Sequence, residues 1–584
     1  MSSPKKRKQG KSPKTVRPGK RALLSEAQSR LEQFLQNRRR LIWSGLFVLL
    51  APLYFSVASN EVGGHPLGGD DLNYLFLAKA LAQGQGYVDL YLPDHPPHTK
   101  YPPLFPLLLV PFTMLGKYQI LGSHLLISGI ALTIPFLLAS WMRRQGYSET
   151  ATLGVLLLAA LMPRYYQFLL FILSEIPFMA FCYLALWWMA KIGPHSKSKD
   201  LGIIILATCG AFFTRTAGIA LAAAIGIELW RRPDLRHFRF ARIPWPVLFA
   251  GAVAFAFTIW SLRNRAVDGA SLGYFRDFLL KDPYNPKTGY ASVMEILVRI
   301  FTQARYYFPL MALQVALGAI HKEPIGYFYF LLIIPIVTGF LARLSRPDKT
   351  AEWFFLFSIF MLIGWSFQES RFMLPILPLA SFYLVRGIGK ILEWMMTRIR
   401  LVQGKELAGI VSLVLVLLIM INQIRVVKGM VRFEHTDRLE PAQPLNLVGY
   451  GLWKEPVINW AKYIKVREGH LQYLTRHFVI NRIAGQLAPP GQVILSRKPL
   501  TTAWLADRPS ISYLFTKDVQ AQWRHLHQNR ISYVYLYSPE PELVALQQSC
   551  PHCFKPLVRS EDGFPALYKI VVYPDGIDTP QRFP

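Results

Sequence analysis

The chain has 584 residues, of which 52% are hydrophobic and 17% are charged, and its formal net charge is +30. Mean hydropathy is +0.25, and apolar runs of about 20 residues recur, each long enough to cross a ~30 Å hydrocarbon core. This composition excludes a soluble enzyme and a disordered protein, and four cysteines are too few to staple a disulfide scaffold of this size. The positive charge indicates a positive-inside topology and contact with anionic membrane lipids, and nucleic acid is not a predicted partner.

The first 40 residues hold 13 Lys and Arg and two acids. They contain little that would form a core, so residues 1–40 are predicted to be a disordered, basic cytoplasmic tail. The run Lys5–Lys8 is similar to a nuclear signal. However, Arg38–Arg40 stand directly before the first apolar span, which favours a topogenic anchor.

Residues 41–429 are predicted to form a module of about eleven membrane-spanning helices. The connections that a cytoplasmic N-terminus would place inside are basic, whereas the short outer connections carry one arginine each: Arg164, Arg215 and Arg371. This asymmetry predicts a cytoplasmic N-terminus, and an odd number of spans then puts the C-terminus outside. The predicted spans lie near 41–59, 119–142, 151–170, 171–190, 201–214, 216–230, 244–263, 325–342, 351–368, 372–389 and 406–424.

Three outer segments follow from this topology: the loops 60–118 and 264–324, and residues 430–584. In the last segment apolar strand-like runs alternate with helix-like segments, which predicts a small extracytoplasmic α/β domain. It contains Cys550-Pro-His-Cys553, a pair that suits a disulfide outside the cytoplasm and is only weak evidence for zinc. The strand-like runs are Gln492–Ser496, Ile531–Ser538 and Leu567–Tyr573, and the helix-like segments are His470–Gln486 and Asp518–His527.

The first outer loop holds two adjacent acids, Asp70 and Asp71. Adjacent carboxylates repel, so one of them is expected to be held by a cation, a metal or a hydrogen bond. The segment Leu72–Leu81 has few charges and is predicted to be a helix on the membrane surface. The acids are therefore either the N-cap of this helix or catalytic groups, and the two roles can coexist.

Three cations lie at the outer ends of apolar runs: Lys100, Arg215 and Arg371. Taken by themselves, such side chains can snorkel to lipid headgroups. Glu175 lies near the outer end of a span, where a carboxylate is costly and so indicates function. His95 and His98 can join an acid at a metal site, although a solvated loop is the favoured interpretation.

Several motifs of this chain form a combined pattern. They are Asp70-Asp71-x-x-Tyr74, then Ala80-Leu81…Gly84-Gln85-Gly86-Tyr87, Lys100-Tyr101-Pro102-Pro103-Leu104, and Arg371-Phe372 with Pro375 and Pro378. The pattern resembles the GT-C fold glycosyltransferases, above all the protein O-mannosyltransferases and the lipid A aminoarabinose transferases of glycosyltransferase family 39. Two details differ: Tyr101 interrupts a Lys-Pro-Pro motif, and Asp71 stands where Glu is usual.

The resemblance implies a hexosyl or pentosyl transferase. It would move one sugar from a polyprenyl-phosphate-linked donor to an extracytoplasmic glycolipid, glycan or protein acceptor, with inversion. By its place in the motif, Asp70 is the general base, and Asp71 orients the acceptor or balances a cation, with Tyr74 in the same binding motif. The leaving phosphate needs positive charge, for which Lys100, Arg215 and Arg371 are the candidates. The resemblance implies an integral protein of a bacterial plasma membrane that requires no cofactor; a divalent metal is left open.

Two other classes of function remain as alternatives. One is a transporter or flippase of lipid-linked glycans, and the other is a non-catalytic membrane scaffold. A transporter is expected to show internal repeats and broken helices near the bilayer midplane. The sequence shows no clear repeat, and its paired acids lie in an outer loop, which favours the enzyme.

Overall fold

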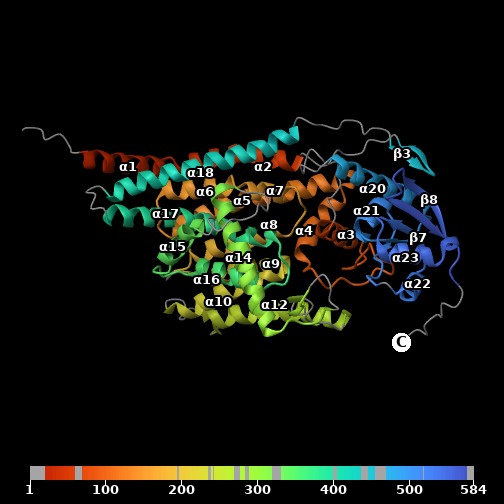
Figure 1. The fold of residues 1–584 in the computed structure, drawn as a ribbon. Helices are drawn as coiled ribbons and strands as arrows, with labels where there is room; N and C mark the ends of the chain where they lie inside the picture. The colour runs from red at the N-terminus through yellow and green to blue at the C-terminus, as the bar shows by residue number, and fades with distance from the viewer. Residues whose placement is uncertain are drawn as a thin grey trace, which may run out of the picture.

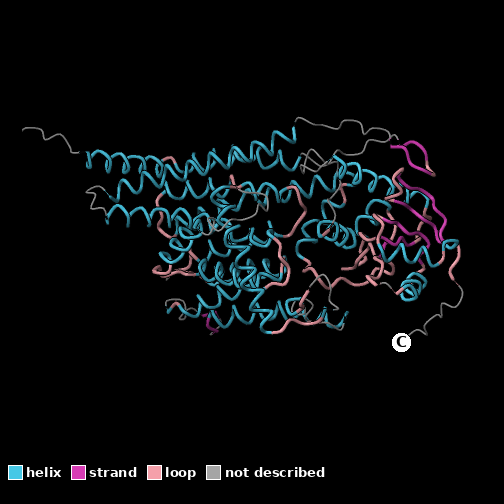
Figure 2. Tube along the Cα trace, viewed as in Figure 1, coloured by secondary structure: helices cyan, strands magenta, loops and turns pink. Residues whose placement is uncertain are grey.

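The computed structural model consists of a large helical part and a smaller part with a mixed β-sheet (Figures 1 and 2). The sheet lies at one end of the molecule, and the N-terminal end of the first helix lies at the other. The described residues are 20–59, 69–193, 196–233, 239–240, 243–268, 277–282, 288–318, 331–398, 404–435, 445–453, 468–516 and 518–574.

The helical part covers the described residues up to His435. Its helices are α1 (Lys20–Asn37), α2 (Arg39–Ser59), α3 (Asp70–Ala82), α4 (Leu104–Thr113), η1 (Gly116–Tyr118), α5 (Gln119–Arg144), α6 (Glu149–Ala160), α7 (Pro163–Leu169), α8 (Glu175–Met189), α9 (Ser198–Thr214), η2 (Thr216–Gly218), α10 (Ile219–Arg231), α12 (Trp245–Asp268), α14 (Val293–Leu317), α15 (Ile333–Arg343), α16 (Thr350–Gly364), η5 (Ser370–Ile376), α17 (Leu377–Arg398) and α18 (Gly404–His435). A short hairpin, β1 (Arg239–Phe240) and β2 (Ile243–Pro244), precedes α12.

Each predicted span overlaps at least one of these helices, but the count of eleven is not confirmed. In the described part of the chain, four helices are long and apolar enough to cross a membrane. A fifth crossing results if α6 and α7, which meet at a 45° bend, form one span. The long helices are Gln119–Arg144, Trp245–Val267, Ser370–Arg398 and Ala408–Lys428. The helix α14, which lies within the predicted outer loop 264–324, was not predicted.

The predicted disordered tail is corrected in part, because residues 20–37 form the helix α1. Residues 1–19 lie outside the described residues. The segment is rich in Ala, Leu, Glu, Gln and Arg, which favour helix. The carboxylate of Glu32 also accepts hydrogen bonds from the backbone N–H groups of Glu149 and Thr150, the first residues of α6. The negative charge at this helix N-terminus ties α1 to the bundle.

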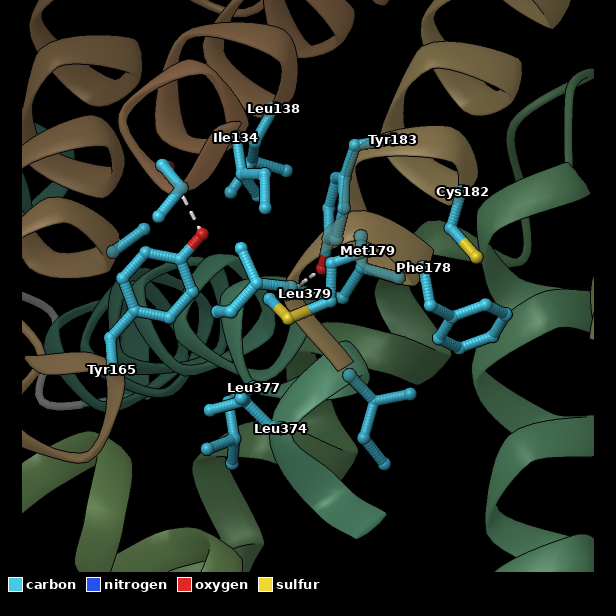
Figure 3. Packing of buried hydrophobic residues seen from close by; sticks show 14 of the residues in the cluster. Ile134, Leu138, Tyr165, Phe178, Met179, Cys182, Tyr183, Leu374, Leu377 and Leu379 are labelled. Carbon is cyan, nitrogen blue, oxygen red and sulfur yellow. Dashed lines mark hydrogen bonds between the residues drawn. The ribbon is translucent and has the colours of Figure 1, made fainter. Parts of the chain in front are cut away.

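The core of the helical part is apolar and contains buried tyrosines whose hydroxyls bond to backbone carbonyls (Figure 3). Tyr183 donates to the carbonyl of Pro375 at 3.1 Å, and this contact joins α8 to η5. Its hydroxyl also accepts from the backbone N–H of Leu379 in α17 at 3.2 Å (Figure 3). Helices α15 and α17 pack with their backbones in contact. A Cβ atom at Gly339 would lie 1.9 Å from the Tyr383 carbonyl oxygen, so only glycine fits this crossing.

The C-terminal part contains a seven-stranded sheet in the order β4-β3-β8-β9-β7-β5-β6, in which β5 is parallel to β6 and β7 and the other pairs are antiparallel. All five predicted strands and helices are present, so the prediction of a small α/β domain is confirmed. The elements are β3 (Leu445–Val448), β4 (Gly451–Trp453), α20 (Glu468–Leu487), β5 (Val493–Ser496), α21 (Pro499–Ala506), β6 (Ser510–Ile511), α22 (Val519–Gln528), β7 (Ile531–Leu536), α23 (Pro541–Ser549), η6 (Pro551–Cys553), β8 (Phe554–Ser560) and β9 (Ala566–Ile570).

Helices cover both faces of this sheet. Alternate residues of β7 point to opposite faces, so Tyr535 packs in one cluster with α20 and Val534 packs in another with α22 and α23. Cys550 and Cys553 form a disulfide where α23 leads through η6 into β8.

The C-terminal domain directly contacts α3 and the loop between α3 and α4. The backbone N–H of Ser510 in β6 donates to the Tyr91 carbonyl at 2.8 Å. Helix α3 packs on α21, where the rings of Phe76 and Trp504 meet edge to face at 5.6 Å. Residues on several sides of α3, including all of Tyr74–Ala78, are buried. Helix α3, which was predicted to lie on the membrane surface, is therefore largely buried within the protein, where it packs against α4 and α21.

Candidate active site

Asp70 is the first residue of α3 and is held by two side chains from distant segments. Arg371 of η5 places Nη2 2.6 Å from Oδ2 of Asp70. The hydroxyl of Tyr101 donates to Oδ1 at 2.6 Å. The N-cap of α3 is Gly69, with φ of 105° and no side-chain capping bond. The N-cap reading of Asp70 is therefore wrong: the carboxylate points to Arg371 and Tyr101 rather than to the helix backbone.

The surroundings of Asp70 keep it ionised at neutral pH. Burial raises the pKa of its carboxyl, but the charge of Arg371, the Tyr101 hydroxyl and the more distant charge of Lys100 outweigh burial. The net result is a pKa below the ordinary aspartate value. Asp70 therefore becomes protonated only at a lower pH than a free aspartate does.

Glu175 lies behind Arg371 at the start of α8 and is 1% exposed. One of its oxygens, Oε1, lies 2.8 Å from Nη1 of Arg215 and 3.8 Å from Nε of Arg371. Two carboxylates and two guanidinium groups thus form a continuous cluster from four segments of the chain. Charge pairing of this kind is what allows a carboxylate to remain buried.

Tyr74 joins this cluster through Ser174. The hydroxyl of Tyr74, one turn after Asp70 on α3, bonds to Oγ of Ser174 at 2.9 Å, and Arg215 donates to the same Oγ at 3.0 Å. The guanidinium groups of Arg215 and Arg371 both lie beside the ring of Phe372, at 5.8 and 5.3 Å from its centroid.

Lys100 and Asp71 lie beside this cluster. The side chain of Lys100 is exposed, and its Nζ lies 5.4 Å from the centroid of the Tyr101 ring. Asp71 is buried, and its Oδ1 accepts from the backbone N–H of Leu72 at 3.0 Å. The structure thus places five of the seven predicted residues in one bonded cluster (Asp70, Tyr74, Glu175, Arg215 and Arg371).

Sequence reasoning missed three side chains of the site. Tyr101 was noted only as an interruption of a motif, yet it bonds to Asp70. Ser174 precedes Glu175 and bonds to both Tyr74 and Arg215. Arg164, the remaining arginine of an outer connection, donates to the hydroxyl of Ser370, next to Arg371. Tyr101 and Ser174 each adjoin a predicted site residue in the sequence, and Arg164 shares the predicted outer side with Arg215 and Arg371.

The structure does not support a metal role for His98. Its Nδ1 bonds to Asp89 and its Nε2 accepts from the backbone N–H of Tyr101, so both ring nitrogens are occupied. Within the described ranges, the only grouping of three potential metal ligands is Cys550, His552 and Cys553, whose two cysteines form the disulfide.

The fold is similar to that of solved glycosyltransferase structures. ArnT from Cupriavidus metallidurans matches in its undecaprenyl phosphate complex with a TM-score of 0.53 and 12% identity over 92% of this chain and 99% of that one. Its apo state matches with a TM-score of 0.53 and 13% identity over 93% and 100%. The oligosaccharyltransferase of Archaeoglobus fulgidus, tethered to an acceptor peptide with an NVT sequon, matches with a TM-score of 0.50 and 10% identity over 86% and 69%.

These proteins are GT-C fold glycosyltransferases, so the chain has the GT-C fold, in agreement with the resemblance of its motifs. No protein-family model matches the sequence, and no curated protein sequence matches it significantly. With its apolar helices, this fold makes the chain an integral membrane protein.

Proposed function

We propose that the chain is a membrane glycosyltransferase that moves one sugar from a polyprenyl-phosphate-linked donor to an extracytoplasmic acceptor, with inversion. The observation that carries the proposal is the pairing of Asp70 with Arg371 and Tyr101 in a chain of GT-C fold. The structure of ArnT with undecaprenyl phosphate supports a lipid-phosphate donor, and the tethered peptide of the oligosaccharyltransferase supports a protein among the acceptor classes, beside glycolipid and glycan.

In the proposed reaction Asp70 is the general base. Its carboxylate takes the proton of the acceptor hydroxyl while that oxygen bonds to the anomeric carbon. The bond from the anomeric carbon to the phosphate oxygen breaks, and polyprenyl phosphate leaves with the electron pair. Attack from the side opposite the phosphate inverts the anomeric configuration. Asp71 orients the acceptor or balances a cation.

The cations of the site have the complementary role of stabilising the phosphate. Arg371, Arg215 and Lys100 supply positive charge where charge develops on the leaving group. In the arrangement described here, Arg371 lowers the basicity of Asp70. A donor phosphate competes for Arg371, so donor binding weakens the Asp70–Arg371 pair and makes Asp70 a stronger base when the acceptor is present.

A transfer assay tests this function. The full chain in lipid nanodiscs is incubated with labelled polyprenyl-phosphate sugars and with an envelope extract, and the product is identified by mass spectrometry. Transfer of one sugar with release of polyprenyl phosphate supports the proposal. Movement of intact lipid-linked sugar across vesicles that contain the chain, without release of the phosphate, would instead establish the transporter.

The proposed reaction uses only groups of the chain and the two substrates, so transfer is expected to continue in excess EDTA. The assay is repeated with EDTA and then with added Mg²⁺ or Mn²⁺. Loss of transfer in EDTA with recovery on adding either ion would contradict this expectation and assign a divalent metal to the reaction.

We also propose the membrane orientation that the loop charges predict, with the N-terminus cytoplasmic and the C-terminal domain outside. A reporter that is active only outside the cytoplasm should be active when fused after Pro584. The same reporter fused after Gln145, between α5 and α6, should be silent. The reverse pattern would show that the orientation is wrong.

A further inference from the structure

The loop between α3 and α4 contains a chain of hydrogen bonds that ends at Asp70. Asp89 bonds to Nδ1 of His98 at 2.8 Å, and Nε2 of His98 accepts the backbone N–H of Tyr101 at 2.8 Å. The Tyr101 hydroxyl then donates to Asp70 at 2.6 Å. Because Nε2 is an acceptor, the proton of the neutral imidazole lies on Nδ1 and is donated to Asp89, which fixes the tautomer of His98.

Ring stacking and bonds to the neighbouring backbone hold Tyr101 in place. The imidazole of His98 stacks on it with centroids 5.2 Å apart and planes at 16°. Tyr87 donates to the Tyr101 carbonyl at 2.8 Å. From α12, Arg263 donates to the carbonyl of His98 and Asn264 donates to that of Thr99 at 2.9 Å. His98 and Tyr101 are 5% and 7% exposed, so the hydroxyl has little freedom to move.

We propose that Tyr101 is a positioning residue for the Asp70 carboxylate and that His98, held by Asp89, acts on Asp70 only through Tyr101. This inference rests on the proposed function, in which Asp70 is the base. Tyr101 holds one oxygen of Asp70 and Arg371 holds the other, so the plane of the carboxylate is fixed. When a donor phosphate competes for Arg371, the Tyr101 hydroxyl remains and keeps the carboxylate oriented toward the acceptor.

The charged and titratable groups around Asp70 define what a test must separate. Arg371 of η5 and Lys100 face it as cations, and its neighbour on α3 is Asp71. Glu175 and Arg215 lie beyond Arg371. Changing Tyr101 to Phe leaves all five in place and removes the hydroxyl that donates to Asp70, which makes Tyr101→Phe the sharpest variant.

The test measures how Asp70 titrates, with and without catalysis. Dicyclohexylcarbodiimide labels carboxyl groups in their protonated form, and peptide mass spectrometry of the full chain in nanodiscs gives the midpoint of Asp70 labelling against pH. Tyr101→Phe removes a donor to the charged form, so the midpoint should rise by about one pH unit. The acid limb of the pH–rate profile should move to higher pH by the same amount, since the base acts only when it is deprotonated. Tyr91→Phe, the same change in the same loop, should leave both unchanged.

A second series tests the role of His98. In His98→Gln the side-chain carbonyl offers an acceptor near the place of Nε2, whereas His98→Leu offers none. We expect His98→Leu to raise the labelling midpoint of Asp70. In His98→Gln the midpoint should stay close to that of the wild type. The double variant His98→Leu/Tyr101→Phe should shift the midpoint no further than Tyr101→Phe alone, because the contacts of His98 described above reach Asp70 through Tyr101.

The outcomes separate this inference from the proposed function. An unchanged labelling midpoint in Tyr101→Phe overturns the inference even if the chain is an active transferase. Additive shifts in the double variant overturn the role given to His98. A wild-type chain that transfers no sugar overturns the proposed function, while the labelling midpoints still decide whether Tyr101 governs the protonation of Asp70.

Discussion

Asp70→Asn is expected to remove nearly all sugar transfer. An amide cannot take the proton of the acceptor hydroxyl at neutral pH, and a general base contributes typically about 10²–10⁴-fold to the rate. Binding of the donor should not weaken, because the phosphate is held by other residues and Arg371 loses a competing carboxylate. The measurements are the turnover number and the KM for the lipid donor, taken on equal amounts of folded protein in nanodiscs.

Asp94→Asn is the matched control for this variant. Asp94 is an exposed acid of the same predicted outer loop, and its φ of 60° is a conformation that Asn tolerates well. The Asp94→Asn variant should therefore have wild-type activity. The start of α3 has no side-chain capping bond, so Asn at position 70 leaves the helix intact. Full transfer by Asp70→Asn would place the base elsewhere, and Glu175 would become the next candidate.

Arg371→Ala is expected to raise the KM for the donor or lower turnover by about ten- to a hundredfold, since a charge-assisted hydrogen bond contributes about 1.5–3 kcal/mol. A second effect follows from the pairing with Asp70. Removing the cation raises the pKa of the Asp70 carboxyl, so the acid limb of the pH–rate profile should move to higher pH. A headgroup anchor would produce neither effect, because it touches neither the phosphate nor Asp70.

Arg398→Ala provides the comparison, because Arg398 is an exposed arginine at the opposite end of α17. It should leave both the KM and the pH profile unchanged. Arg371→Lys should recover part of the loss, since it keeps the charge and loses the paired donors of the guanidinium. Unchanged donor kinetics in Arg371→Ala would leave Arg371 as a structural partner of Asp70 and Glu175.

Much of the fold was accessible from the sequence because its signals are local. Apolar runs bounded by basic residues predicted where helices lie, and short apolar, strand-like runs predicted β5, β7 and β9. The number of crossings was not accessible, because α8 and α16 are too short for a complete crossing by themselves and α6 bends into α7. Helix α14 escaped prediction because Glu295, Arg299 and Arg305 interrupt its apolar pattern.

The site was predictable in its residue types but not in its bonds. Charged residues at outer boundaries pointed to Asp70, Glu175, Arg215 and Arg371, because burying such groups requires partners. Which group pairs with which depends on tertiary contacts between segments as far apart as residues 70 and 371. Tyr101 is the clearest example, because its hydroxyl bonds to Asp70, which lies 31 residues earlier in the sequence.

The packing of α3 on α21 also bears on the order in which the protein is made. Phe76 emerges from the ribosome more than four hundred residues before its partner Trp504. At about 5–20 residues per second, synthesis of the intervening chain takes about 20–90 s. During that interval the helix that carries Asp70 lacks one of its packing surfaces and the Tyr91 carbonyl lacks its bond to Ser510. The residues of the site, from Asp70 to Arg371, are thus synthesised well before the C-terminal domain completes the packing around α3, and a chain that ends before Trp504 lacks that support for the helix of Asp70.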